Sequence, residues 1–145
     1  MINMLVVQSP LAIFLPRVTK EDKKMILNLN NYRNWHHRIS NDTKIRYLTT
    51  IKPQLQGKVL QTPIVVVAKV FKGSNRKMDK DNVVSVHKKF LFDAMVTEGV
   101  IEEDYDEFIH EELTLPTELD KANPRVEFIF YHVDTLEILR LDLAS

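Results

Sequence analysis

The amino-acid sequence predicts an α+β fold, in which a mixed β-sheet packs against helices in one small domain of residues 1–145. The length of 145 residues lies in the range of a single domain. Hydrophobic residues make up 44% of the chain and charged residues 28%, a balance typical of a globular protein and not of a disordered one. Along the chain, apolar residues change between the two-residue period of strands and the 3.6-residue period of helices, which favours the α+β class.

The first half of the chain predicts two elements. Residues 1–23 show no clear period, residues 25–29 alternate weakly and favour a strand, and the polar residues 28–40 favour a loop. A helix follows, with apolar residues at helical spacing and Pro53 as a kink or an end. Its spaced residues are Ile45, Leu48, Ile51 and Leu55, and its candidate caps are Ser40, Asn41 and Asp42.

The second half predicts three strands and a long helix. The strands are predicted over residues 63–71, 108–115 and 125–133. A helical period begins at Asn82 and stops at Gly99, after the polar loop 72–80. Residues 134–145 form either a short helix or a final strand.

Cysteine is absent, so disulfides and thiolate metal sites are excluded and a reducing compartment is the expectation. The longest apolar runs, residues 11–15 and 64–70, are far shorter than the roughly 20 residues of a membrane span. The N-terminus lacks the charged region that precedes the apolar part of a signal peptide. We therefore expect a cytoplasmic protein.

Charge is distributed unevenly although the formal net charge is zero. Residues 1–90 contain 17 of the 20 Lys and Arg residues, and residues 91–145 contain 15 of the 20 Asp and Glu residues. This asymmetry favours a basic face able to follow a phosphate backbone. The alternative is that the two halves interleave in space and their charges cancel.

Two aspartates after the strand 63–71 are candidate metal ligands. Asp79 and Asp81 are two residues apart in an expected extended segment, so their side chains can point the same way. Asp104 joins them only if the chain doubles back over the helix. Clustered carboxylates repel one another unless a cation binds, and oxygen ligands favour Mg²⁺ or Mn²⁺. Nearby Lys72, Arg76 and Lys77 are candidates for phosphate contact.

Each aspartate also has a purely structural interpretation. Asp81 precedes the helix and is a possible N-cap, and Asp79 is then a loop residue. Asp104 belongs to the acidic run 102–107, and most such runs are solvated faces.

Three segments of the second half form one pattern, namely Asp79-Lys-Asp-Asn82, Lys89-Phe-Leu-Phe-Asp-Ala-Met95 and Gly99-Val-Ile-Glu-Glu-Asp104. Together they resemble the signature of the RusA-type Holliday junction resolvases, which are encoded largely by phages and prophages. A looser likeness covers residues 28–38, which resemble the Asn/Arg-rich loop of the family and contain Arg33 and Arg38.

The resemblance implies a RusA-like fold and a homodimeric endonuclease that cuts four-way DNA junctions in a bacterial host cell. It implies Mg²⁺ as the cofactor, with Mn²⁺ as a substitute, held by Asp79, Asp81 and Asp104. A catalytic lysine completes the implied site. Contacts to the branched DNA are expected from Arg33, Arg38, Lys72, Arg76, Lys77 and Lys88.

The sequence departs from the family pattern in two places. The span from Asp81 to Asp93 is longer by about one helical turn, so the family lysine aligns with Ser85 from one side and with Lys89 from the other. We select Lys89, with Lys88 as the alternative, because one extra turn nearly preserves the helix face. The second departure is Lys80, which stands where an apolar residue is commoner.

Two other functions remain open at the level of sequence. The lengthened helix is compatible with a non-catalytic phage DNA-binding protein that keeps the RusA-like fold. The acidic half is compatible with a small interaction domain that binds a partner through that surface.

Overall fold

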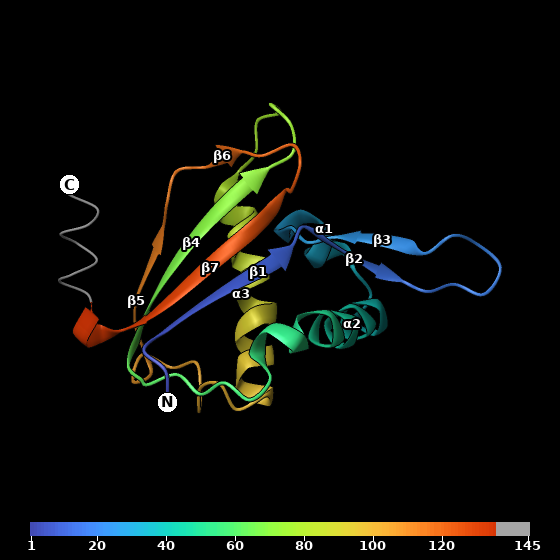
Figure 1. Cartoon of the computed structure of the whole chain (residues 1–145). Coiled ribbons are helices and arrows are strands. Elements are labelled where there is room, and N and C mark those ends of the chain that lie inside the picture. The colour runs from blue at the N-terminus through green and yellow to red at the C-terminus, as the bar shows by residue number, and fades with distance from the viewer. Residues whose placement is uncertain (136–145) are drawn as a thin grey trace.

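A mixed β-sheet with helices behind it forms the body of the protein in a computed structural model, which describes residues 1–135 (Figure 1). The strands are β1 (Met4–Pro10), β2 (Ala12–Leu15), β3 (Lys23–Ile26), β4 (Ile64–Lys72), β5 (Ile109–Thr114), β6 (Glu118–Leu119) and β7 (Arg125–His132). The helices are α1 (Leu29–Asn34), α2 (His37–Leu55) and α3 (Lys80–Thr97), and a 3-10 turn, η1 (Val133–Thr135), follows β7. The α+β prediction is therefore confirmed.

The main sheet has the strand order β1-β7-β4-β5, with the short β6 paired to the end of β4. β7 is antiparallel to both of its neighbours, whereas β4 and β5 are parallel. Parallel neighbours need a crossover connection, and α3 supplies it. The loop before α3 therefore lies at the carboxyl end of β4, and the loop after α3 lies at the opposite end of the sheet.

The core lies between the sheet and α2 and α3. One face of β4 contributes Ile64, Val66 and Val70 to a continuous apolar cluster. The helical period predicted after Asn82 is confirmed, because α3 buries Phe90 and other residues of that period, with Phe90 in contact with Tyr32 of α1 and Tyr47 of α2. The helix stops before Gly99, whose φ of +73° is a left-handed conformation that glycine adopts without steric cost.

One polar contact is buried inside this core. The Ser9 hydroxyl of β1 lies 2.7 Å from the Tyr47 hydroxyl of α2 and 2.7 Å from Nδ1 of His87 on α3. All three side chains are buried. Within residues 1–135, Nε2 of His87 is buried without a hydrogen-bond partner. The contact therefore joins three elements that are distant in sequence.

The N-terminal part of the chain holds structure that the sequence pattern did not predict. Residues 1–23 contain β1, which pairs with β7, and β2, which pairs with β3 in a separate two-stranded sheet. The predicted strand at 25–29 is confirmed only in part, since β3 ends at Ile26. Figure 1 shows the β2–β3 hairpin projecting from the body beside α2.

The prediction of a loop over residues 28–40 is wrong, because α1 and the start of α2 lie there. Tyr32 on α1 contacts the rings of Trp35 and Phe90 edge-on, with centroids 5.9 Å and 5.8 Å away. A six-residue helix has little stability in isolation, so this packing holds it in place.

The predicted helix after residue 40 is confirmed, but its boundaries differ. α2 begins one turn earlier, with His36 as its N-cap, and Pro53 lies inside its last turn. The short helix or strand expected over residues 134–145 lies mostly outside the described residues. Only residues 134 and 135 of that range are described, and they belong to η1. None of the helices in the described part of the chain is both long and apolar enough to cross a membrane.

Candidate functional site

Asp79 and Asp81 lie together where β4 passes into α3. Asp79 is the N-cap of α3, and its Oδ1 accepts a hydrogen bond of 3.1 Å from the backbone N–H of Asp81. Asp81 therefore lies in the first turn of the helix, and the expectation of an extended segment through both residues is wrong. Both side chains are exposed. The cap interaction and the helix dipole stabilise these two charges without a metal ion.

Several cations surround the aspartate pair. Arg76 and Lys77 are exposed, and neither takes part in an ion pair within residues 1–135. Nζ of Lys72 lies 3.4 Å from the carbonyl oxygen of Arg76. Nζ of Lys80 lies 3.5 Å from the carbonyl oxygen of Leu115, between β5 and β6. Arg76 and Lys77 are therefore exposed cations on the same short segment as the two carboxylates.

Acidic residues at the same end of the sheet are already neutralised. Arg125 contacts Asp120 at 2.9 Å and Glu127 at 3.5 Å. The hydrogen bond from Arg125 lowers the pKa of Asp120, because it stabilises the charged form of that carboxylate. Lys69 contacts Glu118 at 3.7 Å. These carboxylates are therefore already paired, and they are not available as further ligands for a metal ion held by Asp79 and Asp81.

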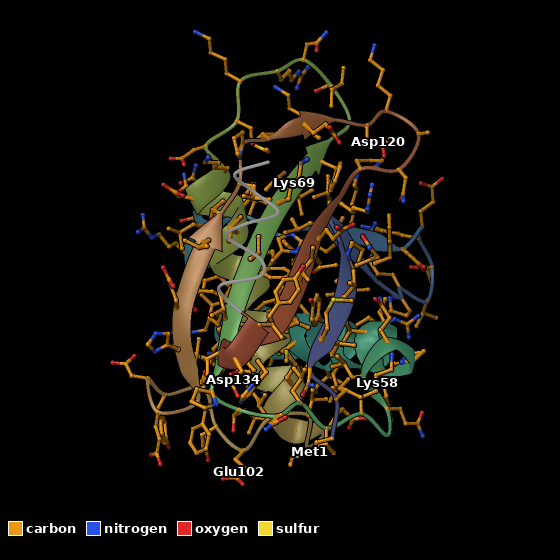
Figure 2. The ribbon with its side chains drawn as sticks, turned by 60° about the vertical axis from the view of Figure 1, so that its left-hand side comes forward. Met1, Lys58, Lys69, Glu102, Asp120 and Asp134 are labelled. Atoms are coloured by element: carbon orange, nitrogen blue, oxygen red, sulfur yellow. The ribbon has the colours of Figure 1, made fainter. Side chains whose placement is uncertain are left out.

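Asp104 lies at the opposite end of the sheet from the aspartate pair. It belongs to the loop between α3 and β5, and it lines a shallow hollow of about 330 Å³ with Asp106 and His110. α3 separates the two places and is 18 residues long, which corresponds to about 27 Å. Figure 2 shows Glu102 of this loop at one end of the strands and Asp120 near the other.

Within one copy of the chain, the three predicted metal ligands therefore do not form one cluster. The chain does not double back over the helix, because the parallel pairing of β4 and β5 requires it to cross the full length of the sheet. In the described part of the chain, no three acidic or histidine side chains lie close enough together to hold a metal ion.

The two candidate lysines lie in the middle of α3, about 11 to 12 Å along the helix axis from Asp81. Nζ of Lys88 contacts Glu112 of β5 at 2.9 Å. Nζ of Lys89 lies 5.5 Å from the ring centroid of Tyr32, on the side that faces α1. Lys88 and Lys89 thus point to different sides of the helix. Ser85, one turn after Asp81, lies closer to the aspartate pair than either lysine.

Arg33 and Arg38 come from two helices and not from the loop 73–79. Arg33 is in the last turn of α1 and Arg38 is in the first turn of α2, and both are exposed. The two oppositely charged halves of the sequence interleave in part, because four ion pairs join a lysine of the first half to an acid of the second. The hairpin and the acidic loop 102–107 nevertheless lie on different sides of the molecule (Figure 1).

Two carboxylates are within the range of protein ligands that hold Mg²⁺. Magnesium commonly takes one or two carboxylates and completes its octahedral coordination with water and substrate phosphate. Oδ2 of Asp79 has no hydrogen-bond partner in the described part of the chain, and Asp81 is exposed. Arg76 and Lys77 precede Asp79 in the same segment, and cations of this kind compensate the charge of a bound phosphate.

Three cations elsewhere were not singled out from the sequence. Arg17, Lys23 and Arg46 line one cleft between the β2–β3 hairpin and α2. No motif connects them, because they come from three elements that meet only in the folded chain. The excess of Lys and Arg in residues 1–90 was the one signal that included them.

No protein-family model matches this sequence, and no curated protein matches it.

Proposed function

We propose that this protein is a homodimeric, Mg²⁺-dependent endonuclease that cleaves branched DNA, with the four-way junction as its substrate. The proposal rests on the resemblance to the RusA-type resolvases, and such an enzyme would act in the cytoplasm of a bacterial host. The observation that carries it is the meeting of Asp79, Asp81, Arg76 and Lys77 at one end of the sheet. Carboxylates and phosphate-binding cations are the groups that metal-assisted phosphodiester hydrolysis requires in one place.

In this proposal Asp79 and Asp81 would hold Mg²⁺, and a bound ion would supply Lewis-acid activation of the cleaved phosphate and of the attacking water. Arg76 and Lys77 bind DNA phosphates next to the cleaved bond and help to neutralise the charge that develops on the cleaved phosphate. The N-cap hydrogen bond of Asp79 fixes its carboxylate relative to the backbone of Asp81. The Asp79 ligand is thus oriented before the substrate arrives.

We further propose that Asp104 acts in the site of the second subunit. The length of α3 keeps it away from the aspartate pair of its own chain. A two-fold symmetric dimer can bring the loop 102–107 of each chain to the aspartate pair of the other. The homodimer then supplies two complete sites, as a symmetric pair of nicks requires.

The direct test is cleavage of a synthetic four-way junction by the purified protein. We expect nicked products with Mg²⁺ or Mn²⁺, none with EDTA, and little cutting of an unbranched duplex of the same sequence. Junction binding without cleavage in the presence of either metal ion would overturn the proposed enzymatic activity and favour the alternative of a non-catalytic DNA-binding protein. Absence of both binding and cleavage would favour the interaction domain.

The lysine assignment makes a separate prediction. Lys89→Ala should lower the cleavage rate by at least tenfold with unchanged junction affinity, because the resemblance to the RusA-type resolvases implies a catalytic lysine at this position. Lys88→Ala should weaken junction binding by a few-fold, since it removes one phosphate contact and a surface ion pair of small energy. Single-turnover rates and binding titrations on both variants distinguish the two roles. The opposite pattern would assign catalysis to Lys88.

A further inference from the structure

A cleft of about 500 Å³ lies between the β2–β3 hairpin and α2, on the part of the molecule where the hairpin projects (Figure 1). Arg17 and Lys23 reach it from the hairpin, and Arg46 reaches it from α2. The only acidic residue among those that line it is Asp42. The cleft therefore has an excess of positive charge.

The three cations are available to a ligand. Within residues 1–135, none of them takes part in an ion pair. Nε of Arg17 donates a 2.7 Å hydrogen bond to the carbonyl oxygen of Glu21, which holds the guanidinium in the hairpin and leaves its terminal nitrogens free of protein partners in that range. Guanidinium groups held in this way bind phosphate oxygens in pairs.

The remaining walls of the cleft are apolar. Leu15 and Pro16 line it on the hairpin side, and Ile39 and Ile45 line it on the α2 side. Ile45 is 63% exposed, so its side chain is accessible to a ligand. Cations beside apolar walls suit a ligand that carries both a phosphate and a flat ring with apolar faces.

We propose that this cleft binds one unpaired nucleotide of a DNA strand, with its base on the aliphatic walls and its flanking phosphates on Arg17, Lys23 and Arg46. A volume of about 500 Å³ is in the range of sites for single small molecules, so it suits one nucleotide and not a double helix. The inference rests on the proposed function for its choice of DNA as the ligand. It adds a second contact surface, remote from Asp79 and Asp81, that selects DNA with unpaired bases.

The test measures binding of a fluorescein-labelled oligothymidylate of about ten nucleotides by fluorescence anisotropy. The double variant Arg17→Ala/Arg46→Ala should bind at least tenfold more weakly than the wild type. Its slope of log K against log[salt] should be shallower by about one to two, because two phosphate contacts are lost. The matched control, Lys52→Ala/Lys58→Ala, removes the same charge at and just beyond the far end of α2 and should change affinity by less than twofold.

The base contact is tested with an abasic strand of the same length. The wild type should bind the abasic strand several-fold more weakly, and Ile45→Ser should remove this difference. Three results would each overturn the nucleotide site. The first is the same loss of affinity for the oligothymidylate in both double variants, and the second is the same wild-type affinity for the abasic and the normal strand. The third is displacement of the labelled strand by polyglutamate as effectively as by unlabelled oligothymidylate.

The outcomes also distinguish the cleft from the proposed nuclease. Binding that depends on Arg17 and Arg46 without any junction cleavage would overturn the nuclease alone. Junction cleavage together with unaltered strand binding in the Arg17→Ala/Arg46→Ala variant would overturn the cleft alone. Thermal unfolding of each variant checks that the exposed substitutions leave the fold intact.

Discussion

Asp81→Asn should lower the rate of Mg²⁺-dependent junction cleavage by about a thousandfold or more, with junction affinity almost unchanged. Loss of a charged ligand removes several kcal/mol of transition-state stabilisation, and each 1.4 kcal/mol is about tenfold in rate. Asparagine has the shape of aspartate, so the first turn of α3 is preserved. The matched control is Asp93→Asn on the same helix, which removes an exposed carboxylate that contacts Lys44 at 3.7 Å. A wild-type rate for Asp81→Asn would reject the metal site.

Asp79 requires a different choice of substitution, because it is also the N-cap of α3. Asp79→Asn keeps the cap, whereas Asp79→Ala removes it and should cost about 1 kcal/mol of stability. Comparison of the two variants separates the role in folding from the proposed role in catalysis. Cleavage should be lost in both, and stability only in the alanine variant.

Mixing two inactive variants tests the proposed exchange of Asp104 between subunits. A heterodimer of Asp81→Asn and Asp104→Asn chains carries both defects in one site and leaves the other site intact, so mixing should restore measurable nicking. If Asp104 served its own chain, every site would carry one defect and the mixture would stay inactive. Asp106→Asn, which changes a neighbouring exposed carboxylate, should be active alone.

Acid should destabilise the protein through His87. Burial lowers the pKa of His87 to about 3 from its ordinary value of 6.5, so the folded chain keeps the ring neutral while the unfolded chain takes up a proton below pH 6.5. The free energy of unfolding should therefore fall by about 1.4 kcal/mol per pH unit from near pH 6 downward, or about 3 kcal/mol at pH 4. Above pH 6.5 the ring is neutral in both states and contributes no pH dependence.

Urea unfolding at pH 7, 6, 5 and 4 measures this effect, and His87→Leu isolates it from the carboxylates. The leucine variant also removes the unpartnered Nε2, so its stability at pH 7 reflects both a lost hydrogen bond to Ser9 and a lost buried polar atom. The free energy of unfolding of this variant should depend less steeply on pH than that of the wild type, by the uptake of about one proton on unfolding. His110→Gln, at an exposed position, is the control. Parallel curves for wild type and His87→Leu would contradict the prediction.

The long periodic segments were predictable because local pattern and tertiary packing agree there. β4 is a run of Val and Ile that suits a central strand buried on both faces, and α3 carries an apolar face over five turns. β1 was not predictable, because its first four residues are apolar on the buried and on the exposed face alike, and because the polar Ser9 lies in the core. Its pairing partner, β7, is more than 100 residues away in the sequence.

Four residues of the candidate site are neighbours along the chain and could be grouped without the fold. Asp79, Asp81, Arg76 and Lys77 lie within one short segment between a strand and a helix, and local geometry keeps them together. The position of Asp104 and the directions of the two lysines follow from the fold. The parallel pairing of β4 with β5 requires α3 to span the sheet, so the start and the end of that helix lie at opposite ends of the molecule. The cleft of Arg17, Lys23 and Arg46 follows the same rule, because its cations meet only when the hairpin packs beside α2.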